Sequence, residues 1–106
     1  MSMTPKQVEL ARRLVAHPKF EDRGGMRAER VYDHETYTAQ DLPDLGDCAT
    51  KGRLLEMLQQ PFSIHCSNEG SAFVWCVLRR TAILASDEPD LGTALATALL
   101  KQWEEP

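Results

Sequence analysis

Histidine and cysteine are adjacent at His65 and Cys66, the first pair to consider for metal binding. The segment 62–67 alternates apolar and polar residues, which predicts a β-strand. Successive side chains of a strand point to opposite faces, so these two residues cannot both bind one ion. No other zinc-type spacing accompanies them, so we expect neither a metal nor a cofactor.

The three cysteines, Cys48, Cys66 and Cys76, are odd in number and lack a CxxC spacing. We therefore expect reduced, mostly buried thiols rather than disulfides. Cys48 follows Asp47 at an expected helix start, the kind of position at which reactive cysteines occur. No nucleophile signature or identifiable histidine partner completes a catalytic site, so we expect no enzyme activity.

Acidic residues concentrate in the middle of the chain. Residues 21–47 carry a net charge of −5, against +3 for residues 1–20 and −2 for residues 48–106. Basic residues form no run, so we expect no binding of duplex DNA by the chain alone. Gly24-Gly25 is followed by neither GxGxxG nor GxxxxGK, which argues against a phosphate loop.

Within this acidic segment the carboxylates do not follow the order of a calcium-binding loop. The spacing of Asp41, Asp44 and Asp47 is instead typical of turns and helix caps. An acidic loop is also able to face a basic partner. The candidate partner-binding residues are Asp33, Glu35, Asp41 and Asp44.

Length and composition are those of one ordinary globular domain spanning residues 1–106, with 42% hydrophobic and 26% charged residues. No stretch approaches the roughly 20 apolar residues of a membrane span. The first residues lack the layout of a signal peptide. We therefore expect a cytoplasmic protein of the host cell that does not bind membranes.

Three helices are expected. Thr4, Pro5 and Gln7 form a capping box that opens a helix over 4–17. Asp47 caps a second helix over 47–59, in which Gly52 indicates close packing against another backbone. Ser86 or Asp87 caps the last helix, whose Trp103 is either a lid on the core or part of a subunit contact.

Strands are expected over 26–32, 62–67 and 72–78, with 33–46 as a long loop and 81–85 as a strand or an extended connection. The segment 72–78 is apolar on both faces, with Trp75 assigned to the core, which indicates a sheet covered on both sides. The predicted fold is α+β, an antiparallel sheet of three or four strands with helices on both faces, in the order α-β-α-β-β-α. The alternative is a two-layer sandwich whose second sheet face is covered by a partner subunit.

The segment Leu42–Leu55, LPDLGDCATKGRLL, resembles the LPDL-D-ATxGxLL segment of small proteins encoded by bacteriophages and prophages. The Ala/Leu-rich helix over 94–100 resembles the closing helix of the same proteins, and Leu10–Val15 and Gly25–Arg27 also fit. Residues 19–23 depart from the group, which often has more aromatic residues there. The resemblance implies a phage α/β/α-sandwich domain of undefined activity and transfers no functional residue.

The sequence thus predicts a phage- or prophage-encoded accessory protein that acts by binding another protein, as a monomer or homodimer, without catalysis. The alternative is an anti-defence inhibitor, similar to an anti-CRISPR protein, whose acidic loop occupies a basic nucleic-acid groove on a host effector.

Overall fold

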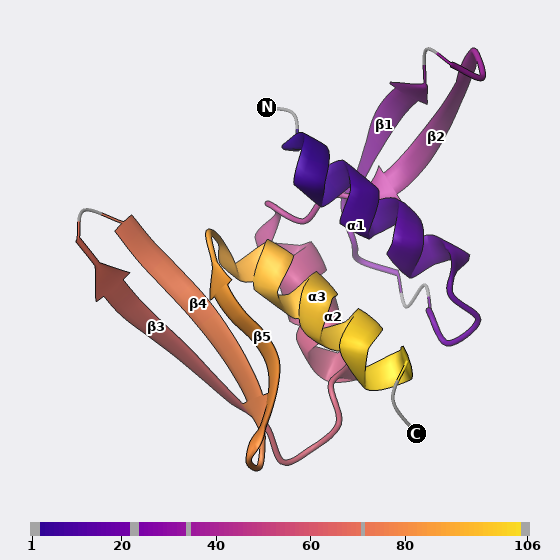
Figure 1. Ribbon diagram of the computed structural model, residues 1–106. Coiled ribbons are helices and arrows are strands. Elements are labelled where there is room, and N and C mark those ends of the chain that lie inside the picture. The colour runs from indigo at the N-terminus through magenta and orange to yellow at the C-terminus, as the bar shows by residue number, and fades with distance from the viewer. Residues whose placement is uncertain (1–2, 22–23, 34, 71, 105–106) are drawn as a thin grey trace.

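The computed structural model describes residues 3–21, 24–33, 35–70 and 72–104. Its helices are α1 (Pro5–Ala16), α2 (Cys48–Met57) and α3 (Leu91–Glu104). Its strands are β1 (Ala28–Asp33), β2 (Thr38–Pro43), β3 (Ser63–Glu69), β4 (Ala72–Arg79) and β5 (Ala82–Glu88). They form a two-stranded sheet β1-β2 and a three-stranded sheet β3-β4-β5, both antiparallel (Figure 1). The predicted α+β class and antiparallel pairing are confirmed.

The caps predicted for the first two helices are present. The backbone N–H of Gln7 donates to Thr4 Oγ1 at 3.2 Å, and the Gln7 side chain accepts from the Thr4 backbone N–H at 2.9 Å. Asp47 Oδ2 accepts a hydrogen bond from the backbone N–H of Thr50 at 3.1 Å. Each cap satisfies amide groups that have no partner within their own helix.

The last helix begins later than predicted. Its first turn is capped by Asp90, whose Oδ1 accepts from the backbone N–H of Thr93 at 2.8 Å. Ser86 and Asp87, the residues predicted to cap it, belong to β5. The backbone φ of Asp87 is +55°, and the register of β5 shifts beside it, so its carboxylate lies in an irregular part of the strand.

All three helices lie on one side of the three-stranded sheet (Figure 1). The inner face, which α3 covers, holds the fully buried Val77 and the half-buried Trp75, while Val74 and Leu78 point to the outer face. Ile83, opposite Leu78 on β5, is 55% exposed. The structure therefore differs from the predicted sheet with helices on both faces.

The reason for this difference is the central place of α3, which packs on the sheet by one side and on α1 and α2 by the others. A helix enclosed in this way is apolar around most of its circumference. Its buried residues are Gly92, Thr93, Ala94, Leu95, Ala96, Ala98, Leu99 and Leu100. The helices α1 and α2 thus pack against α3, and neither covers the outer face of the sheet.

Trp103 lies over the end of α1. Its ring is 4.9 Å from that of His17 between centroids, with the ring planes inclined by 32°. Trp103 is half-buried and packs against the core of its own chain.

A hairpin replaces the loop predicted over 33–46. Strand β2 pairs with β1 along its whole length, from Ala28 opposite Pro43 to Asp33 opposite Thr38. Leu42 and Pro43 are buried, whereas residues 38–41 are exposed. Because only the end of β2 enters the core, the apolar alternation by which strands are predicted is nearly absent from it.

Candidate partner-binding hairpin

The structure distributes the four candidate acids along the β1–β2 hairpin rather than bringing them into one cluster. Asp33 is the last residue of β1, opposite Thr38, and Glu35 lies in the turn. Asp41 is in the middle of β2, and Asp44 follows the end of that strand. Only the first two therefore lie near the tip.

Asp44 forms the turn at the base of the hairpin. Its Oδ1 accepts from the backbone N–H of Gly46 at 3.0 Å, and its backbone carbonyl accepts from that of Asp47 at 3.0 Å. Its own backbone N–H donates to the carbonyl of Arg27 at 2.8 Å. These contacts match the turn role that the spacing of the acids indicates.

Asp41 is paired across the hairpin. It lies directly opposite Arg30, and Asp41 Oδ1 is 3.5 Å from Arg30 Nη1. Both side chains are mostly exposed, so water and salt screen this pair strongly. The pair partly neutralises the acidic surface that the sequence predicts.

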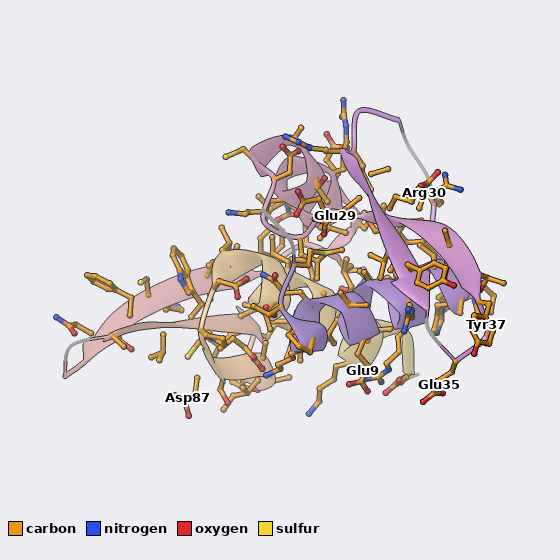
Figure 2. The ribbon with its side chains drawn as sticks, turned by 90° about the horizontal axis from the view of Figure 1, so that it is seen from above. Glu9, Glu29, Arg30, Glu35, Tyr37 and Asp87 are labelled. Carbon is orange, nitrogen blue, oxygen red and sulfur yellow. The ribbon has the colours of Figure 1, made fainter. Side chains whose placement is uncertain are left out.

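The tip of the hairpin presents aromatic side chains. Tyr37, in the turn, is 80% exposed, and Tyr32, near the end of β1, is 48% exposed. The backbone φ of Tyr37 is +57°, in the left-handed region that residues other than glycine adopt at a cost of roughly 1–2 kcal/mol. A hydrogen bond of 2.6 Å between the hydroxyls of Thr36 and Thr38 braces the turn around it. Figure 2 shows Glu35 and Tyr37 at the outer end of the hairpin.

A shallow groove of about 660 Å³ runs between α1 and β1, beside this tip. Val8 and Val31 supply apolar wall, and Glu9 and Glu35 supply carboxylates. The other lining residues are Met3, Pro5, Arg12 and Tyr32. The groove and the tip together form a surface that is both aromatic and acidic, which we call the hairpin surface.

We expect mutation of the acidic residues in this region to have two different effects on the free energy of unfolding, depending on whether the residue caps a helix or forms an exposed ion pair. Asp47→Ala removes the cap of α2 and should lower the free energy of unfolding by about 1 kcal/mol. Asp41→Asn removes only an exposed ion pair and should change it by less than about 0.5 kcal/mol. Urea unfolding followed by circular dichroism measures both. A large loss for Asp41→Asn would make this residue structural and remove it from the candidate partner-binding residues.

The register of the sheet places His65 directly opposite Cys76, whereas Cys48 lies on α2. Cys48 and Cys66 are exposed and Cys76 is half-buried, so the prediction of mostly buried thiols is wrong. Cys48 is the first residue of α2, and Cys66 lies on β3, at the edge of the three-stranded sheet. His65 Nε2 lies 3.2 Å from Ser63 Oγ, both on an exposed strand where water competes for the contact. Among the described residues, no three His, Cys, Asp or Glu side chains are grouped to hold a metal.

Comparison with protein-family models, with curated proteins and with solved structures found no significant match. Over the part of the chain that the structure describes, no helix is long and apolar enough to cross a membrane.

The two tyrosines of the hairpin surface were not among the candidate residues predicted from the sequence. Tyr37 occurs in a polar, turn-rich segment, where no core-facing periodicity explains a large aromatic residue, whereas Tyr32 ends the strand predicted over 26–32. A large aromatic residue that belongs to no hydrophobic periodicity is the sequence feature that could have indicated an exposed functional residue.

Proposed function

We propose that the chain is a small phage- or prophage-encoded accessory protein that acts by binding a host protein, without catalysis, through the hairpin surface. Tyr37 carries this proposal. A large side chain is held 80% exposed at the tip of a braced hairpin, in a backbone conformation that is unfavourable for it. Tyrosine is enriched among the residues that dominate binding energy at interfaces.

The charge of the hairpin suggests the chemistry of the partner. Residues 28–43 hold four acidic residues and one arginine, and α1 adds Glu9 and Arg12, whose opposite charges offset each other. Opposite potentials on two surfaces accelerate association and exclude wrong partners. A basic protein surface with an apolar recess for Tyr37 therefore fits the hairpin surface best.

Affinity capture from host lysate tests this function. The tagged wild-type chain and an Ile83→Ser variant should retain the same partner, and Tyr37→Ser should lose it. Ile83 is the matched control, since it is 55% exposed but lies on β5, away from the hairpin. Binding of a purified partner should weaken by roughly ten- to thirtyfold with Tyr37→Ser, as about 1.4–2 kcal/mol at an interface hot spot implies. Equal retention by all three proteins would contradict the role of the hairpin surface.

The anti-defence inhibitor is the second candidate, favoured by the net charge of −3 over residues 28–43. In that case the captured partner is a nucleic-acid-binding effector, and its own nucleic acid competes with the chain. Glu35→Gln should then weaken binding and reduce its dependence on salt. A partner that binds the chain and its nucleic acid simultaneously would exclude this candidate.

A further inference from the structure

Strand β3 forms one edge of the three-stranded sheet and pairs only with β4 in it. Figure 1 shows it as the outermost strand, on the side of β4 away from α3. An edge strand presents a row of backbone N–H and C=O groups that can pair with another strand. The opposite edge, β5, is instead packed against α3.

This edge lacks the devices that usually protect a free strand. Ser63–Asn68 contains no lysine, arginine, aspartate, glutamate or proline, and its pairing with β4 is regular throughout. Charged side chains, prolines and bulges are the common means of preventing strand addition. A regular, uncharged strand of this length therefore favours pairing.

The strand is also complementary to itself. In antiparallel pairing, residues directly opposite each other point to the same face of the sheet. When two identical strands pair about a two-fold axis, this condition holds only if the axis passes through a residue, which then lies opposite its own counterpart. An axis at Cys66 pairs all seven residues of β3, because Cys66 is the midpoint of Ser63–Glu69. Glu69, the only acidic or basic residue in the sequence of β3, is then paired in register with Ser63 of the second copy rather than with its own counterpart.

From this complementarity we propose that two copies of the chain associate through β3, forming a continuous six-stranded antiparallel sheet centred on Cys66. The same register places Cys66 beside its counterpart on the inner face. Each of the two cysteines is flanked by Trp75 of its own chain, the residue that pairs with Cys66 on β4. The shared row across the interface is therefore tryptophan, cysteine, cysteine and tryptophan.

The acidic hairpin does not oppose this association. The β1–β2 hairpin lies at the other end of the molecule from β3, as both views show (Figures 1 and 2). The molecule is 42 Å long, against a screening distance of about 8 Å at physiological salt. The dimer thus separates the two acidic hairpins and leaves both accessible.

The native cysteines allow a direct test by oxidation. A chain that keeps only Cys66, through Cys48→Ser and Cys76→Ser, should form a covalent dimer with copper phenanthroline and oxygen. A chain that keeps only Cys76 should not, because its two copies lie three strand spacings apart, about 14 Å, too far for a disulfide. Linkage through Cys76 and not through Cys66 would indicate association through the outer sheet faces and would overturn the proposal.

Sedimentation velocity tests the same interface without oxidation. The wild-type chain should have twice the monomer mass, and Cys66→Lys should have the monomer mass, because two lysines would lie directly opposite each other. Ala82→Lys is the matched control on an exposed position of β5, and it should remain a dimer. A wild-type chain that stays monomeric up to the highest soluble concentration, or a Cys66→Lys variant that stays dimeric, refutes the model. Should the lysine variant not fold, the oxidation of the two single-cysteine chains decides alone.

Discussion

Gly92→Ala is expected to lower the free energy of unfolding by about 3 kcal/mol, as overpacking of a closed site does. A Cβ atom at this position would overlap the carbonyl oxygen of Leu45 and would lie 2.8 Å from its carbonyl carbon. Leu45 is fully buried, and the obstructing atoms are backbone, which cannot move aside as a flexible side chain can. The first turn of α3 would have to shift away from the loop before α2.

Gly52→Ala is the matched control and should have the opposite effect. This glycine lies on the exposed side of α2, and nothing lies within 4 Å of the Cβ that alanine would add. Alanine should therefore raise the free energy of unfolding by about 0.5–1 kcal/mol, the usual gain over glycine in a helix. Urea unfolding of both variants gives the comparison. Equal effects from the two substitutions would mean that α3 does not approach Leu45 closely in solution.

The two glycines show why part of the fold was predictable and part was not. The sequence predicted a close backbone approach at Gly52, because glycine is unfavourable inside a helix unless close packing requires it. The structure assigns it to Gly92, at the start of α3. Which helix approaches which loop depends on the tertiary arrangement, and helix propensity contains no information about it.

The first two helices were placed to within a residue or two from their predicted caps, because a cap is a local interaction. Thr4 and Asp47 satisfy amides three residues away, so their role can be recognised without the rest of the fold. Strand β2 was missed because its partner β1, rather than its own composition, holds Thr38–Pro43 extended. The same limit applies to the candidate site: the acids were visible in the sequence, but the pairing of Asp41 with Arg30 depends on the register.

Substitutions on the two faces of β4 are expected to differ most in their effect on the stability of the chain. Val77→Asp should remove most or all of the stability of the chain, whereas Val74→Asp should leave it folded. Val77 is fully buried on the face that α3 covers, so an aspartate there would be an unpaired charge in the core. Such a group costs several kcal/mol, a large part of the 5–15 kcal/mol that holds a typical domain folded.

Val74 lies on the same strand but on the outer face, where it is only half-buried and no helix covers it in the described structure. Aspartate there remains in contact with water, so the expected loss is about 1 kcal/mol, the range of strand propensities. Circular dichroism and thermal unfolding of both variants measure the difference. A sheet with helices on both faces, as the sequence alone predicts, requires both variants to unfold. Unfolding of Val74→Asp would therefore show that the outer face is covered in solution, and survival of that variant alone would establish a sheet with one helical face.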